Sequence, residues 1–189
     1  MIKVGVTAFQ GDVEEHIITV ERAMDSMGIE GRAIPIREKM VDVDALIIPG
    51  GESTTISSLM IKTGIFEEIK KIADDIPIMG TCAGCILMSK EVDHAVKTLE
   101  LMDMEVERNA FGRQKDSFQC SLDIEGFDKP FPAVFIRAPL IKRVWGNCRV
   151  MAKIDNDIVM AKEDNKLALT FHPELTGDLR IHQYFLNML

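Results

Sequence analysis

Two cysteines stand three positions apart among small residues, in the stretch GTCAGC at residues 80–85. Cys82 is framed by Gly80 and Gly84, which is the Gly-x-nucleophile-x-Gly elbow with cysteine in place of serine. Such an elbow is a tight, strained turn between a strand and a helix, and small flanking residues let it form. We therefore predict that Cys82 is a nucleophile above a sheet, where the dipole of the following helix favours the thiolate. The backbone amide of Ala83 would then face a developing oxyanion.

Other interpretations of this cysteine pair stay open at this point. Cys82 can be a buried cysteine in a glycine-rich turn, or the pair can be a redox motif beside a βαβ unit. A redox pair of that kind opens a helix without two framing glycines. A zinc site needs two further ligands at suitable spacing, but Cys120 and Cys148 stand alone in the sequence, so we predict no metal. Cys85 is interpreted as a small buried hydrophobic residue.

A nucleophilic cysteine requires a histidine base, and that base requires an orienting acceptor. His172 ends the apolar run LALTF and is followed by Pro173 and Glu174. In an extended chain, residues two apart point the same way, so Glu174 can hold the His172 imidazole in one tautomer. A surface His–Glu pair is the alternative. The remaining histidines are assigned to packed or hydrogen-bonded structure on predicted helices (His16 and His182) or to a solvated stretch (His94).

A glycine-rich segment, PGGESTT at residues 49–55, follows another predicted strand. Ligands of open α/β sheets bind at the carboxyl ends of the strands. Gly51 can therefore offer a bare backbone amide to an oxyanion, opposite Ala83. The alternative is a plain turn with Ser53 as the cap of the next helix, and both can hold. The segment is not a phosphate-binding Walker loop, because it has no lysine.

Composition restricts the class of protein further. The chain has 189 residues, 22 basic and 30 acidic, for a net charge of −8, which argues against nucleic acid as a partner. No apolar run approaches the ~20 residues of a membrane span, and MIKVGVTAFQGD shows no secretory signal. Four cysteines in a chain of this length do not make a disulfide scaffold. We expect reduced thiols, a cytoplasmic location and one domain over residues 1–189.

The first half of the chain alternates strand and helix patterns. Strands are predicted over residues 2–8, 31–36, 45–49 and 76–80. Helices are predicted from Asp12, as N-cap, to Gly28, from Ser53 to before Gly64, and over residues 65–74. Such alternation indicates βαβ units, and hence an α/β fold with a mostly parallel central sheet and helices on both faces.

The second half carries short strand patterns and only one helix pattern. Asn156 and Asp157 predict a turn between two of these strands, so we expect some antiparallel pairing. A closing helix is predicted over residues 178–188. The predicted strands are residues 99–106, 117–124, 132–137, 148–154, 157–162 and 166–171.

Together, PGGEST, GTCAG and HPE resemble the class I, triad-type glutamine amidotransferases. More segments of the chain match the glutaminase subunits of pyridoxal 5′-phosphate synthases within that family. These are Gln10-Gly11 with Glu15-His16, RNAFGRQ at residues 108–114 with Ser117-Phe118, FIRAP at 135–139, and HQYF at 182–185. The resemblance therefore covers essentially the whole chain.

The resemblance implies a flavodoxin-like three-layer sandwich that hydrolyses L-glutamine to L-glutamate and ammonia, with no cofactor. Cys82 would form a glutamyl thioester, with His172 shuttling the proton and Glu174 orienting it. The amides of Gly51 and Ala83 would form the oxyanion hole. Arginine forks bind carboxylates, which supports a role for arginines in holding a free amino acid. The implied glutamine contacts are Gly51, Glu52, Ser53, Arg108, Ile136 and Arg137.

The resemblance also implies a partner, because this chain has no second domain to use ammonia. That partner would be the barrel protein of the synthase, with a (β/α)₈ fold, which forms a large ring with glutaminase subunits docked outside. Gln10 would lie near the interface and help to set the oxyanion region, so activity would be low until the partner binds. The family usually has an aliphatic residue at Cys85, and a Cys82–Cys85 disulfide would inactivate the enzyme.

Two alternative functions stay open. One is the glutaminase of another pathway, such as imidazole glycerol phosphate or anthranilate synthesis, although the RNAFGRQ and HQYF segments argue against it. The other is a non-catalytic interaction protein of the related cysteine-elbow type, which would lack the HPE and PGGEST segments together. Release of ammonia from glutamine would distinguish the enzyme from the non-catalytic protein.

Overall fold

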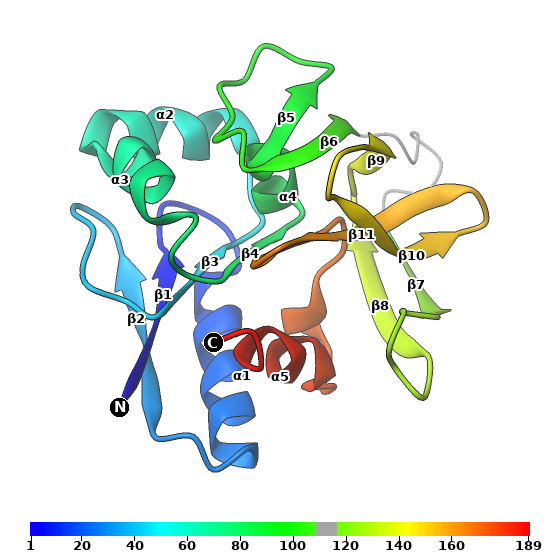
Figure 1. The fold of residues 1–189 in the computed structure, drawn as a ribbon, viewed down its shortest axis with the longest axis horizontal. Helices are drawn as coiled ribbons and strands as arrows, with labels where there is room; N and C mark the ends of the chain where they lie inside the picture. The colour runs from blue at the N-terminus through cyan, green and yellow to red at the C-terminus, as the bar shows by residue number, and fades with distance from the viewer. Residues whose placement is uncertain (109–116) are drawn as a thin grey trace.

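A computed structural model describes residues 1–108 and 117–189 of the chain. The predicted family segment after Arg108, residues 109–114, lies outside these described residues. Within the described residues, a ten-stranded sheet runs through the molecule, and a separate two-stranded ribbon lies beside it (Figure 1). The path of the main sheet is β2-β1-β3-β4-β12-β11-β9-β6-β5, and β10 pairs with β11 off this path.

The parallel half of the sheet contains the predicted βαβ units. Its neighbouring strands β2, β1, β3, β4 and β12 all pair in parallel. The strands are β1 (Ile2–Thr7), β2 (Gly31–Ile36), β3 (Ala45–Ile48), β4 (Ile78–Thr81) and β12 (Lys166–Leu169). The helices are α1 (Val13–Ser26), α2 (Ser53–Thr63), α3 (Ile65–Ile72), α4 (Ala83–Met88) and α5 (Arg180–Leu186).

Antiparallel pairing dominates the other half, as predicted. The strand β11 pairs antiparallel with β12, β9 and β10, while β6 pairs antiparallel with β9 and parallel with β5. The strands are β5 (Ser89–Val92), β6 (Met102–Glu107), β9 (Leu140–Val144), β10 (Arg149–Ile154) and β11 (Asp157–Glu163), with the ribbon made by β7 (Ser117–Leu122) and β8 (Phe131–Ile136).

Two of these strands were not predicted from the sequence. The strand β5 reads SKEV and β9 reads LIKRV, so neither shows the apolar or alternating pattern of a buried strand. Both lie in the outer half of the sheet, where pairing with β6 rather than burial of side chains holds them. The predicted turn between two strands is present and joins β10 to β11, but it lies one residue earlier, at residues 155–156, because Asp157 already pairs with Ile154 as the first residue of β11.

Helices cover both faces of the sheet and give three layers (Figure 1). On one face, α2, α3 and α4 pack into a core that includes Phe66 and Leu87. On the other face, α1 and α5 pack into a second core that includes Met24 and Phe185. Buried β3 serves both cores, since its alternate residues point to opposite faces. The predicted α/β fold with helices on both faces is confirmed.

The carboxyl ends of the parallel strands lead into the segments that carry the predicted site. The loop after β1 contains Gln10, the loop after β3 contains the PGGEST segment, and β4 runs directly into Cys82. Among the described residues, no helix is long and apolar enough to cross a membrane.

Candidate active site

The backbone at Cys82 has the strained conformation that a nucleophile elbow requires. Its φ is +49° and its ψ is −103°, at the junction between β4 and α4. A Cβ atom on Gly84 would lie 1.9 Å from the carbonyl oxygen of Ile48, and one on Gly80 would lie 2.6 Å from the carbonyl carbon of Gly84. Both framing glycines are therefore required for close backbone packing, as the sequence predicted.

The PGGEST loop packs tightly beside this elbow. A Cβ on Gly50 would lie 2.7 Å from the ring of His172, and a Cβ on Gly11 would lie 1.8 Å from the Gly50 carbonyl oxygen. Gly51 has a φ of +141°. The first loop is tied to this segment as well, because the Glu52 backbone N–H donates to Oε1 of Gln10 at 3.0 Å. Three loops thus converge on one place.

His172 and Glu174 are paired, but by a different local structure from the one predicted. The Nδ1 of His172 lies 2.7 Å from Oε1 of Glu174, and both residues are buried. The chain between them is not extended, since Pro173–Leu175 forms the short 3₁₀ helix η1. This turn, rather than the i, i+2 relation of an extended strand, brings the carboxylate beneath the imidazole.

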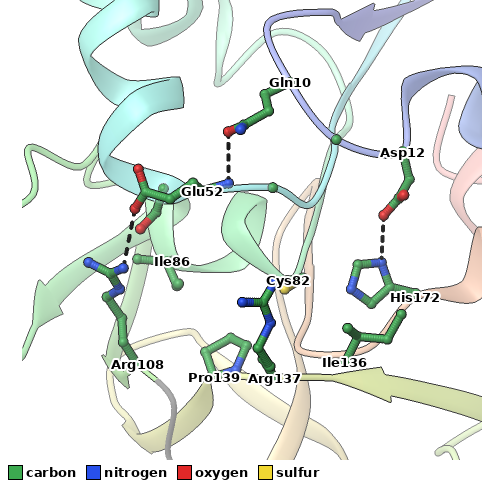
Figure 2. A pocket seen from close by; sticks show the side chains of 13 residues that line it. Gln10, Asp12, Glu52, Cys82, Ile86, Arg108, Ile136, Arg137, Pro139 and His172 are labelled. Carbon is green, nitrogen blue, oxygen red and sulfur yellow. Dashed lines mark hydrogen bonds and ion pairs between the residues drawn. The ribbon is translucent and has the colours of Figure 1, made fainter. Parts of the chain in front are cut away.

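A second carboxylate faces the same ring nitrogen and was missed by the sequence reasoning. The Oδ2 of Asp12 lies 3.2 Å from Nδ1 of His172 (Figure 2). Asp12 occupies the predicted N-cap position of α1, but its side chain makes no cap hydrogen bond. Its hydrogen bond with His172 lowers the pKa of the Asp12 carboxyl. An Asp at the start of a helix is ordinarily explained as an N-cap, so Asp12 was not assigned to the site from the sequence.

These acceptors control the charge of His172. Burial disfavours the imidazolium, but hydrogen bonds with Asp12, Cys82 and Glu174 outweigh it and raise the pKa of His172 to about 12. Burial raises the pKa of the Glu174 carboxyl, and its hydrogen bond with His172 opposes that effect. The site therefore favours a protonated His172 beside Cys82, as a thiolate–imidazolium pair requires.

A cavity of about 480 Å³ opens over Cys82 and His172. All of the predicted site residues line it except Ala83, which begins α4, and Glu174, which is buried behind His172. Figure 2 shows side chains from separate loops directed at this space. The lining residues are Gln10, Gly11, Asp12, Gly51, Glu52, Ser53, Cys82, Ile86, Arg108, Ile136, Arg137, Pro139 and His172.

The cavity carries both signs of charge. The Nη2 of Arg108 lies 3.2 Å from Oε1 of Glu52 (Figure 2). Arg137 follows β8 with a φ of +42°, an unusual conformation for a non-glycine residue, and its side chain lines the same space. Two carboxylates, of Asp12 and Glu52, and two guanidinium groups therefore lie in the same pocket as the nucleophile.

The cap of α2 differs from the one predicted. Glu52, not Ser53, is the N-cap residue, and its carboxylate accepts hydrogen bonds from the backbone amides of Thr54 and Thr55. Hydrogen bonds from the Thr54 and Thr55 side chains lower the pKa of Glu52 to about 2, so the group is ionised. The hydroxyl oxygen of Ser53 is buried and has no hydrogen-bond partner among the described residues.

The four cysteines are free thiols, and the second cysteine of GTCAGC does not line the cavity. Cys85 is fully buried in the core beneath α4, and desolvation raises the pKa of its thiol. Burial also raises the pKa of Cys148, to about 12. Cys82 is half-buried and lines the cavity.

This contrast predicts the order of alkylation. Iodoacetamide at neutral pH should label Cys82 at least ~10-fold faster than Cys85 in the folded protein, because only thiolates react and burial suppresses thiolate formation at Cys85. A time course of labelled peptides measured by mass spectrometry tests this. Denatured protein, in which the thiols should react at similar rates, is the control. Equal rates in the folded protein would contradict the assignment of Cys85 to the core.

Comparison with known proteins shows which family this architecture belongs to. The model of the SNO glutamine amidotransferase family matches residues 6–189. The chain belongs to the SNO glutamine amidotransferase family. This match confirms the predicted class of enzyme, a glutamine amidotransferase, and the family resemblance predicted from the sequence.

Full-length relatives agree with this membership. The chain is 49% identical to a protein of Thermococcus kodakarensis over 194 aligned positions, covering 99% of this chain and 98% of that protein. It is 50% identical to one of Archaeoglobus fulgidus, with 99% and 98% covered, and 47% identical to one of Pyrococcus furiosus, with both chains fully covered. All three are named pyridoxal 5′-phosphate synthase subunit PdxT.

Solved structures support the same fold. A crystal structure of a glutamine amidotransferase superimposes with a TM-score of 0.86 at 41% identity, covering 98% of this chain and 97% of the other. A crystal structure of a glutamine amidotransferase from Thermotoga maritima superimposes with a TM-score of 0.66 at 11% identity, covering 96% of this chain and 80% of the other. The second similarity concerns the fold alone.

Proposed function

We propose that this protein hydrolyses L-glutamine through a covalent thioester. The Cys82 thiolate attacks the side-chain carbonyl carbon of glutamine, and the resulting oxyanion is held by the backbone amides of Gly51 and Ala83. The protonated His172 then gives its proton to the leaving amino group. The carbon–nitrogen bond breaks, and ammonia and a glutamyl thioester on Cys82 are formed.

Water completes the reaction in the second half. His172, now neutral, takes a proton from the attacking water, and the hydroxide adds to the thioester carbonyl. Collapse of this intermediate breaks the carbon–sulfur bond, releases glutamate and restores the thiolate–imidazolium pair. Glu174 orients the ring throughout, which its 2.7 Å contact with Nδ1 of His172 supports.

Recognition of a free amino acid fits the charges that line the cavity. A zwitterionic substrate presents one carboxylate and one ammonium group, and the cavity presents guanidinium groups together with the ionised Glu52. We assign the substrate carboxylate to Arg108 and Arg137, and the ammonium group to Glu52. The hydroxyl of Ser53, which has no hydrogen-bond partner in the part of the chain that the structure describes, and the side chain of Ile136 complete the proposed substrate contacts.

Ammonia is of use only if a second protein receives it. We propose that the acceptor is the (β/α)₈ barrel subunit of a pyridoxal 5′-phosphate synthase in a large cytoplasmic hetero-oligomer, since the relatives are named as subunits of that synthase. Gln10 and its loop would lie at the interface. The contact between Gln10 and the backbone of Glu52 supports an effect of that interface on the oxyanion hole, because it links the first loop to the PGGEST segment, which contains Gly51.

One observation carries the enzyme proposal: Cys82, His172 and the buried Glu174 adjoin a cavity lined by two acidic residues and two arginines. None of these features is needed by a non-catalytic interaction protein. The match to relatives named for a single synthase favours that pathway over other amidotransferases.

The decisive experiment measures ammonia release from glutamine with and without the barrel subunit from the same organism. We expect slow turnover by the isolated subunit and at least ~10-fold faster turnover in the complex, because the first loop contacts the PGGEST segment that contains Gly51. The barrel subunit of an unrelated amidotransferase is the control. Absence of ammonia release in the cognate complex would refute the enzyme proposal, and equal stimulation by both barrels would refute the assignment to this synthase.

A further inference from the structure

Two residues of the helix α1 contact Glu174. The hydroxyl of Thr19 donates to the backbone carbonyl of Glu174 at 3.4 Å. One turn earlier on the same helix, Nε2 of His16 lies 3.2 Å from the carboxylate oxygen Oε2 of Glu174. The two carboxylate oxygens therefore face different imidazoles, with Oε1 toward His172 and Oε2 toward His16.

The second carboxylate oxygen of Glu174, Oε2, is buried without a well-aligned hydrogen-bond donor among the described residues. The side chain of Glu174 is fully buried, and Oε2 accepts no well-aligned hydrogen bond from any described residue. An ionised carboxylate oxygen without a donor is costly in the protein interior. Nε2 of His16, 3.2 Å away, is the polar group placed to donate to this oxygen.

Two further contacts hold the His16 ring in place. Its Nδ1 lies 3.3 Å from Nε2 of His182 on α5, and its Nε2 lies 3.0 Å from Oγ1 of Thr81, the residue before the nucleophile. His16, His182 and Thr81 are all completely buried. The prediction that His16 and His182 belong to hydrogen-bonded structure is confirmed, and that structure adjoins the candidate site.

These contacts select one tautomer. An ionised carboxylate only accepts hydrogen bonds, so the 3.2 Å contact with Glu174 is attractive only when Nε2 of His16 carries the hydrogen, which then also lies toward Oγ1 of Thr81, the hydrogen-bond partner of that nitrogen. The Nδ1 of His16 then accepts a hydrogen bond from Nε2–H of His182. This arrangement leaves Nδ1 of His182 as a bare acceptor, which agrees with its lack of a partner among the described residues.

Burial lowers the pKa of His16 well below its ordinary value, and repulsion between its imidazolium form and those of His182 and His172 adds to this effect. Burial lowers the pKa of His182 to about 3, so both rings favour the neutral form. The groups that face His16 are thus Glu174, Thr81, His182 and the more distant His172. His16 can donate a hydrogen bond without adding a positive charge that would compete with the His172 imidazolium.

We propose that His16 is a positioning residue of the reaction, which holds the second oxygen of Glu174 while His182 locks its tautomer. The row of groups Cys82–His172–Glu174 extends in this way to His16 and His182. This inference rests on the proposed function, since it concerns the same site. Its consequence is that the helices α1 and α5, far from the nucleophile in sequence, help to set the orientation of His172.

The first test compares three variants in the full chain assembled with its barrel partner. His16→Leu removes both nitrogens, whereas His16→Gln keeps an amide N–H near the position of Nε2. Val20→Ala is the matched control, because Val20 is a fully buried residue of α1 that offers no polar partner. We expect kcat to fall ~10-fold or more in the leucine variant with KM within ~2-fold, the scale on which supporting residues act. The glutamine variant should recover most of the loss, and the control should keep kcat within ~3-fold.

A second readout needs neither glutamine nor the partner. The rate at which iodoacetamide alkylates Cys82 is followed against pH in the isolated subunit. Burial already raises the pKa of Glu174, and loss of the His16 donor raises it further, so that Glu174 is held more often in its protonated form. A protonated Glu174 no longer stabilises the imidazolium of His172, which in turn favours the Cys82 thiolate less. We expect the midpoint of the alkylation profile to move upward in His16→Leu and to return toward the wild-type midpoint in His16→Gln.

The outcomes separate this inference from the proposed function. Without ammonia release by the wild-type complex, the function fails, whatever the variants do. With an active wild type, an unchanged kcat and alkylation profile in His16→Leu would overturn the positioning role, as would a glutamine variant no better than leucine. If the leucine variant does not fold, His182→Leu replaces it: a lowered kcat at constant KM supports the inference, and wild-type kinetics overturn it.

Discussion

Replacing Cys82 with alanine is expected to abolish ammonia release from glutamine, by at least ~10⁴-fold in kcat, while glutamine still binds. The thioester cannot form without the sulfur atom, but the charged groups that line the cavity remain. Alanine meets the same strain as cysteine at a φ of +49°, so the elbow itself should persist. Ammonia release by the complex and calorimetric titration with glutamine measure the two properties separately.

The neighbouring cysteine is the matched control for this substitution. Cys85→Ala removes a buried thiol from the core under α4, three residues from the nucleophile. A modest loss of stability and turnover within a few-fold of wild type are expected. Equal loss of turnover from both substitutions would show that Cys82 does not act alone and that the interpretation of Cys85 as a packing residue is wrong.

Replacing Gly84 with alanine is expected to destabilise the protein by more than about 3 kcal/mol and to remove activity. The new Cβ would lie 1.9 Å from the carbonyl oxygen of Ile48, a backbone atom that cannot rotate away. Relief requires α4 to separate from β3, which carries the PGGEST loop. Denaturant unfolding followed by circular dichroism measures the loss, and ammonia release measures the effect on the site.

Gly177→Ala is the control for the glycine substitution. No heavy atom lies within 4 Å of the Cβ that would be added there, and this glycine does not have a positive φ. Its free energy of unfolding should stay within about 0.5 kcal/mol of wild type. If the two alanine variants were equally stable, close packing at Gly84 would not be the reason for a glycine in the elbow.

The nucleophile elbow and the parallel half of the fold were predictable, because their causes are local. A buried strand is recognisable from a short apolar run, and an elbow from two glycines that frame a nucleophile. Carboxyl ends of parallel strands meet at one edge, so the PGGEST segment and Cys82 were expected to come together. The polar strand β5 escaped detection because pairing with β6, not burial, holds it.

The supporting groups of the site could not be read from the sequence, because they arise from contacts between distant elements. Asp12 sits at a helix start, where a capping role is the ordinary expectation, yet its carboxylate faces His172. His16 and His182 lie 166 residues apart, and their contact exists only because α1 and α5 pack on the same face of the sheet. The amino-acid sequence by itself thus identifies which residues can react, whereas the packing of the layers decides which neutral and charged neighbours hold those residues in position.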